Sequence, residues 1–245
     1  MDLSLKVLSE RKTSMNRHKF WSLAIPTLLV MGLVGQSVQQ PARPIGFANA
    51  IQEFLDQDKA SPPPQGAILF IGSSIFRLWA DLKTQMAPLP VFNRAFGGSR
   101  TWEVLHYMDK IVLPYKPRII VYYCGSNDVD AGASAAEISA NFKAFVNKVA
   151  AQLPETRIFY VSINKAPEKK ALWNVVDEAN SLIRDYTVHN KQLGFIDVNP
   201  VLFDASGKPR LELYRDDLLH FHPPAYVEFT KIVRPVIEKA WNIPR

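Results

Sequence analysis

The sequence predicts an α/β fold in which helices cover both faces of a parallel five-stranded sheet. Five short apolar runs read as strands, and amphipathic patterns of helical period separate them. Strands that are apolar on both faces are typical of parallel sheets covered on both sides. The length of 245 residues fits one large domain.

The first half of the chain is expected to alternate between the two element types. Phe47, Ile51, Phe54 and Leu55 share one face at helical spacing, and three consecutive prolines soon follow. A continuous apolar run, AILFI, then predicts a buried strand. The expected elements are a helix over 47–58, a strand over 67–71, a helix over 75–82, a strand over 91–93 and a helix over 101–112.

The second half contains the strongest strand pattern, RIIVYYC at 118–124, which is rich in β-branched and aromatic residues. A long helix follows, with Ile138, Phe142 and Phe145 on its apolar face. Pro235 is expected to kink the last helix. The further expected elements are helices over 135–152, 173–189 and 223–241 and strands over 157–163 and 193–196.

Charge and cysteine content exclude several classes of protein. The formal net charge is +6, but residues 1–40 carry half of it, and no basic cluster interleaves with aromatic residues. Nucleic-acid binding is therefore not expected. A single cysteine, Cys124, excludes an internal disulfide framework and a zinc site built on several cysteines.

Residues 1–40 are predicted to be a signal peptide, with residues 41–245 as the functional domain. Basic residues 17–19 precede an apolar run at 21–34, which is short for a membrane span and contains Pro26. The alternative is an uncleaved N-terminal membrane anchor. Both predict a protein exported to the periplasm or beyond, either free or anchored to the membrane.

Two details of this leader stay open. Small residues at Gly35 and Ser37 offer a cleavage site, and Ala48–Ala50 is a second option inside the first expected helix. Translation could begin at Met1 or at Met15. A lipoprotein is excluded, because no cysteine follows the apolar run.

Candidate functional residues follow the predicted strands, where ligands of parallel sheets bind. GSSI at 72–75 places a hydroxyl at a helix N-terminus, and paired glycines at 97–98 follow the second strand. GSND at 125–128 follows the third strand, and DLLH at 217–220 spaces a carboxylate to orient a histidine. Taken singly, each pattern is explained at least as well by a helix cap, a turn or a solvated pair.

Near the C-terminus the sequence offers a choice of partners. Asp216 could replace Asp217, and His222 could replace His220, but the three-residue spacing selects Asp217 with His220.

Together, in this order, the four motifs resemble those of the SGNH hydrolases, also called the GDSL esterase/lipase family. The resemblance covers residues 47–241. It implies a flavodoxin-like three-layer α/β/α sandwich with strand order 2-1-3-4-5. It also implies a catalytic triad of Ser74, Asp217 and His220, and an oxyanion hole formed by Ser74, Gly98 and Asn127.

The chain departs from the family pattern without losing a reacting group. Ser73 replaces the usual aspartate, which leaves open whether Ser73 or Ser74 attacks. Ile75 replaces the usual leucine, Ala95 stands where glycine is common, and Leu218 replaces a frequent glycine.

The resemblance implies a serine hydrolase that cleaves carboxylic esters with small or medium acyl groups. A carbohydrate O-acetylesterase, and a lysophospholipase or thioesterase, use the same machinery and remain alternatives, as does a non-catalytic binding module. No cofactor or metal is expected, and the sequence lacks HExxH, G-x-S-x-G and phosphate-loop patterns. The expected partner is a small-molecule, glycan or lipid ester, and the oligomeric state is left open.

Several residues beside the motifs are expected either to tune the pocket or to serve packing. They are Arg77, Trp79, Arg100, Trp102, Asp128 and Asp130.

Overall fold

Five parallel strands form one sheet in the order β2-β1-β3-β4-β5 in this computed structural model, which describes residues 43–243. The predicted fold class and strand order are both confirmed. β1 and β3 are buried along their whole length because each has a strand on either side and helices on both faces. The strands are β1 (Ile68–Gly72), β2 (Val91–Asn93), β3 (Ile119–Tyr123), β4 (Arg157–Val161) and β5 (Leu193–Ile196).

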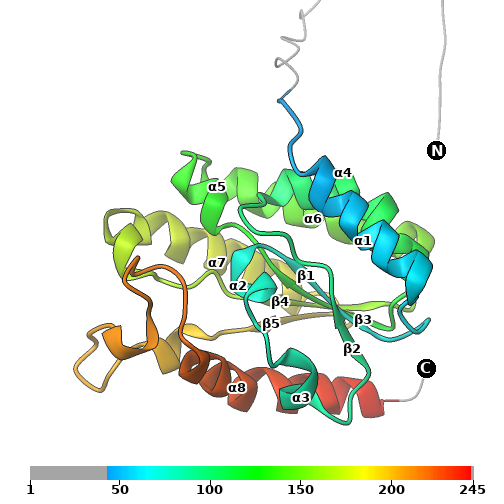
Figure 1. Cartoon of the computed structure of the whole chain (residues 1–245). Coiled ribbons are helices and arrows are strands. Elements are labelled where there is room, and N and C mark those ends of the chain that lie inside the picture. The colour runs from blue at the N-terminus through cyan, green and yellow to red at the C-terminus, as the bar shows by residue number, and fades with distance from the viewer. Residues whose placement is uncertain (1–42, 244–245) are drawn as a thin grey trace, which may run out of the picture. The chain divides into compact units, whose positions relative to one another are not determined.

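The α-helices make up the two outer layers of the sandwich (Figure 1). One core cluster joins the sheet to α1, α4, α6 and α7, and a second joins the opposite face to α2, α3 and α8. The helices are α1 (Ala48–Ala60), α2 (Ser74–Arg77), α3 (Leu82–Met86), α4 (Thr101–Ile111), α5 (Ser126–Asp130), α6 (Ala135–Gln152), α7 (Trp173–Val188) and α8 (Pro223–Asn242).

The single helix predicted over 75–82 is wrong. Two short helices, α2 and α3, occupy this region, and the chain turns between them. At the turn, Trp79 is buried against the ring of Tyr226 in α8, and its indole N–H donates to Gln85. The helix ends here, and the turn allows the large Trp79 side chain to be buried. The spacing of apolar residues in the sequence did not predict this break.

Other predicted boundaries agree within a few residues, and α6 matches its predicted range. The segment 126–130, for which no helix was predicted, forms the short helix α5. Four 3₁₀ helices complete the described elements: η1 (Leu113–Tyr115), η2 (Pro167–Leu172), η3 (Asn199–Leu202) and η4 (Leu211–Leu213). Pro235 lies inside α8.

The predicted signal peptide or anchor at 1–40, and the choice between Met1 and Met15, lie outside the described residues. The chain from Pro44 onward forms one compact unit. Within residues 43–243, no helix has the length and apolar character needed to cross a bilayer. The alternative cleavage site, Ala48–Ala50, forms the first turn of α1.

Candidate active site

Gly72 sets the sharp turn from β1 into α2. Its φ is 137°, in the range that favours glycine, and a Cβ at this position would lie 1.7 Å from the carbonyl oxygen of Tyr123 in β3. Only glycine allows this approach. The turn places Ser74 at the first position of α2, directly beyond the carboxyl end of a central strand.

Ser74 and His220 lie in hydrogen-bond contact although 146 residues separate them in the sequence. Ser74 Oγ is 2.9 Å from His220 Nε2. Ser73 has a different environment: its Oγ is buried and has no hydrogen-bond partner within residues 43–243. Of the two serines that the sequence left open, Ser74 is the one that faces the histidine.

Asp217 holds His220 through both of its carboxylate oxygens. Oδ2 lies 2.7 Å from His220 Nδ1, while Oδ1 accepts the backbone N–H groups of His220 and Leu219 at 2.9 and 3.0 Å. Desolvation acts to raise the pKa of Asp217, but the hydrogen bonds from His220 and Leu219 outweigh it and lower the pKa to about 2. Asp217 is therefore an ionised acceptor at neutral pH, suited to hold Nδ1 protonated.

The alternative pair makes no such contacts. His222 donates its backbone N–H to Leu213 O, and within the described residues neither its ring nor the Asp216 carboxylate forms a hydrogen bond with Ser74 or His220. The three-residue spacing therefore selects the pair that the structure brings together.

The loop that carries His220 is braced at its base. Tyr214 pairs with Phe221 in an antiparallel bridge, and Arg215 bonds His220 O through its N–H and Phe221 O through Nε. Leu218 has a φ of 53°, a conformation that favours glycine. The leucine that stands here therefore carries backbone strain.

Three candidate donors follow the carboxyl ends of β1, β2 and β3. The Ser74 and Gly98 N–H groups have no protein acceptor within residues 43–243, and Gly98 adopts a φ of 84°. Asn127 Nδ2 donates one hydrogen bond to Ser99 O at 3.0 Å, which leaves its second amide hydrogen for another acceptor. Ser99 Oγ in turn bonds Gly72 O at 3.0 Å. The three loops are therefore tied to one another beside Ser74.

The sequence left open whether Asp128 shapes the pocket or serves packing. In the structure it connects two helices. Its buried carboxylate accepts the backbone N–H and the hydroxyl of Thr101 at the start of α4. Desolvation raises its pKa, while the hydrogen bonds from Thr101 and the charge of Arg100 act against the rise. Asp128 thus joins α5 to α4 from behind Asn127.

Lys169 is a buried side chain near the site that the sequence analysis missed. Its ammonium donates to Ser126 O at 3.0 Å and lies 3.7 Å from the Asp130 carboxylate. The preceding residue, Glu168, donates its N–H to Leu218 O. η2 therefore connects the Asn127 segment to the His220 loop. A pair of lysines in a polar stretch gave no signal of this burial.

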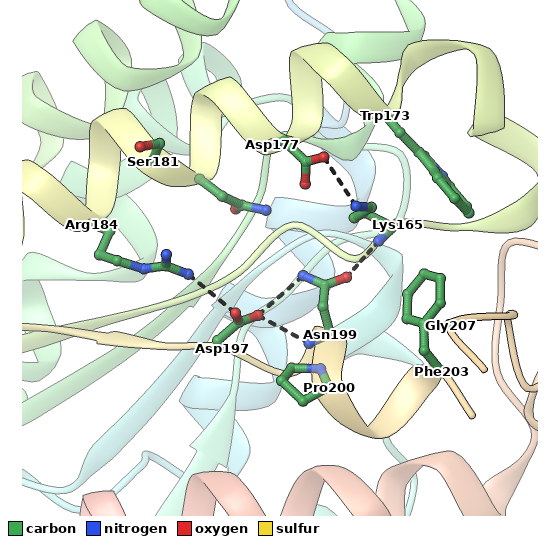
Figure 2. A pocket seen from close by; sticks show the side chains of 11 residues that line it. Lys165, Trp173, Asp177, Ser181, Arg184, Asp197, Asn199, Pro200, Phe203 and Gly207 are labelled. Atoms are coloured by element: carbon green, nitrogen blue, oxygen red, sulfur yellow. Dashed lines mark hydrogen bonds and ion pairs between the residues drawn. The ribbon is translucent and has the colours of Figure 1, made fainter. Parts of the chain in front are cut away.

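A separate cavity of about 530 Å³ lies at the carboxyl ends of β4 and β5 (Figure 2). Neither Ser74 nor His220 lines it. Its charged groups pair across it, Lys165 with Asp177 at 3.0 Å and Arg184 with Asp197 at 3.1 Å. The lining residues are Lys165, Trp173, Asp177, Asn180, Ser181, Arg184, Asp197, Asn199, Pro200, Phe203 and Gly207.

Across residues 43–243, no three His, Cys, Asp or Glu side chains are grouped so that they could hold a metal ion. Cys124 is buried at the end of β3, and its thiol contacts Ser99 O. Burial raises the pKa of this thiol well above its usual range. Of the described nucleophile candidates, Ser74 is the one in contact with a base.

Comparisons with known proteins identify the family and the fold. The model of the GDSL-like lipase/acylhydrolase family matches residues 70–227, which span all four motifs. No curated protein matches the sequence.

Solved structures share the fold at low sequence identity. A Bacteroides fragilis protein superposes with a TM-score of 0.70 at 18% identity, covering 79% of this chain and 98% of its own. A GDSL-like lipase from Bacteroides thetaiotaomicron superposes with a TM-score of 0.65 at 17% identity, covering 78% of this chain and 98% of its own. A carbohydrate esterase family 3 structure from Talaromyces cellulolyticus superposes with a TM-score of 0.59 at 15% identity, covering 73% of this chain and 99% of its own.

Proposed function

Because this chain belongs to the GDSL-like lipase/acylhydrolase family, we propose that it hydrolyses carboxylic esters through an acyl-enzyme on Ser74. The observation that carries the proposal is the continuous contact from Ser74 Oγ to His220 Nε2, and from His220 Nδ1 to Asp217. A serine hydroxyl is a weak nucleophile at neutral pH and needs an adjacent base, which this contact supplies.

In the first half-reaction, Ser74 Oγ attacks the ester carbonyl while His220 Nε2 takes its proton. The Asp217 carboxylate keeps the ring oriented with the proton on Nδ1, and it stabilises the imidazolium that forms. His220 then donates the proton to the departing alkoxide, so that an alcohol leaves and the acyl group stays on Ser74. In the second half-reaction water takes the place of the serine hydroxyl, and the acid is released.

The tetrahedral intermediate places a negative charge on the former carbonyl oxygen. The N–H groups of Ser74 and Gly98 and the remaining amide hydrogen of Asn127 are the donors proposed to receive it. Two of them have no other protein acceptor within residues 43–243, which supports this role. Such donors act on charge that develops in the transition state, where they lower the barrier most.

Labelling with a fluorophosphonate probe tests the nucleophile. Wild type and Ser73→Ala should be labelled, whereas Ser74→Ala should not. Ser73→Ala is a matched control, because it removes the neighbouring hydroxyl, which is buried and makes no hydrogen bond in the described part. Labelling that persists in Ser74→Ala would move the nucleophile. A folded wild type that resists the probe would favour a non-catalytic binding module.

A second candidate is a carbohydrate O-acetylesterase, favoured by the similarity in fold to the carbohydrate esterase of Talaromyces cellulolyticus. Activity against a chain-length series of p-nitrophenyl esters, with acetylated xylan alongside, separates the candidates. Release of acetate from xylan would favour the carbohydrate esterase. A preference for longer acyl chains would favour a lysophospholipase or thioesterase.

We further propose that the enzyme is exported, on the basis of the basic and apolar pattern at 17–34. Cell fractionation followed by N-terminal sequencing tests this. Protein that begins near residue 36 would support a cleaved signal peptide, and full-length protein in the membrane fraction would support an anchor. Full-length protein in the cytosol would contradict both.

A further inference from the structure

Arg77 lies on the same helix as Ser74 and close to the glycine loop. It follows Ser74 by three residues in α2, so both residues lie on one side of the helix. Its guanidinium group lies over Gly97: a Cβ on that glycine would be 2.5 Å from Arg77 Nε and 3.1 Å from Cζ. Gly97 thus makes room for the guanidinium beside Gly98, a proposed oxyanion donor.

Arg77 is exposed, and its charge is not neutralised by the described part of the protein. No carboxylate within residues 43–243 pairs with it, and no carbonyl there accepts its hydrogen bonds. Four other arginines, by contrast, each form an ion pair with a carboxylate: Arg94, Arg184, Arg210 and Arg234.

A second arginine, Arg215, donates its backbone N–H to the carbonyl oxygen of the proposed base, His220. Arg215, in the loop that carries His220, uses Nε to bond Phe221 O, and its terminal nitrogens make no ion pair within residues 43–243. Tyr226 donates its hydroxyl to Ile75 O, next to Ser74. Burial raises the pKa of Tyr226, and the charges of Arg215 and Arg77 act against that rise.

We propose that Arg77, assisted by Arg215, forms an anion subsite, so that the preferred esters carry a carboxylate or phosphate beside the scissile bond. This rests on the proposed function. A guanidinium binds such planar or tetrahedral oxyanions through two parallel hydrogen bonds, and its charge raises the local concentration of anionic substrate. The subsite would specify which esters the enzyme prefers, and the acyl-transfer steps would stay the same.

The test compares esters that are matched except for charge. On the acyl side, mono-p-nitrophenyl glutarate is compared with p-nitrophenyl valerate. On the alcohol side, monobutyryl glycerol phosphate is compared with monobutyryl glycerol. In wild type, kcat/KM should favour the anionic member of at least one pair, and this ratio should fall about tenfold in Arg77→Gln, mainly through KM. The pair that responds identifies which side of the ester carries the anion.

Arg77→Lys should keep part of the preference, because it keeps the charge and loses the fork geometry. Lys83→Gln, which removes an exposed charge from α3, should leave the ratio unchanged. Added salt should erode the wild-type preference. A wild type that hydrolyses neutral and anionic esters equally would overturn the subsite, as would an Arg77→Gln variant that retains the full preference.

These outcomes stay separate from those of the proposed function. Hydrolysis of the neutral esters that is lost in Ser74→Ala supports the esterase whatever the anion preference. If folded wild type hydrolyses none of these esters, the proposed esterase function itself is contradicted.

Discussion

Asp217 contacts His220 at both its ring and its backbone, with Oδ2 2.7 Å from Nδ1 and Oδ1 2.9 Å from the backbone nitrogen. One carboxylate therefore fixes the orientation of the imidazole and the shape of the loop that carries it. The three-residue spacing lets a single side chain make both contacts within one turn of the loop.

Asp217→Asn should lower kcat by a factor of about 10³ to 10⁴ and change KM little, because the amide can donate to Nδ1 and favour the wrong tautomer. Stopped assays with a p-nitrophenyl ester measure both constants. Asp216→Asn is the matched control, since Asp216 is also exposed and forms no hydrogen bond with His220 in the described part of the chain. Equal losses in the two variants would contradict the assigned role.

The Asp217 carboxyl should titrate near pH 2 in wild type and closer to the ordinary aspartate value in His220→Ala, because the ring hydrogen bond holds its pKa down. Since the folded-state pKa is depressed, the pairing stabilises the fold above the unfolded pKa, and this contribution is lost as pH falls toward 2. Carboxyl ¹³C NMR measures both titrations. An unchanged value in His220→Ala would contradict the ring contact.

Asn127→Ala should lower kcat about 10²- to 10³-fold while the protein stays folded, because it removes one proposed oxyanion donor. It also removes the hydrogen bond to Ser99 O, so the variant needs a stability check by thermal unfolding. Asn127→Asp keeps the shape but lacks the donor, and it should be similarly slow. An unchanged kcat in folded Asn127→Ala would contradict the role.

Gly72→Ala should lower the free energy of unfolding by about 3 kcal/mol or more, because the added methyl group overlaps the Tyr123 carbonyl and the φ of 137° is strained. Gly132→Ala is the matched control: its φ is 78°, but no atom lies within 4 Å of the added Cβ. Gly132→Ala should lower the free energy of unfolding by only about 1 kcal/mol, the cost of placing an alanine in a left-handed backbone conformation. Urea unfolding measures both, and equal losses would contradict the steric explanation.

Much of the fold was readable from local pattern. Strands such as 91–93 and 193–196 and the helix at 135–152 match their predicted ranges, because apolar runs and helical periodicity directly reflect burial. The region after Ser74 was not readable in this way. There the burial of Trp79 against Tyr226, which lies far away in sequence, interrupts the predicted helix.

By itself, the sequence determined which loops carry the four motifs and which side chains are candidates for the site. It could do so because each motif is a short run of neighbouring residues. Only the tertiary structure shows that Ser74, and not Ser73, contacts a histidine 146 residues away. The burial of Lys169 and the exposed, unneutralised charge of Arg77 beside Gly97 were likewise decided by packing. Contacts between distant segments set these environments, and residue spacing carries no information about them.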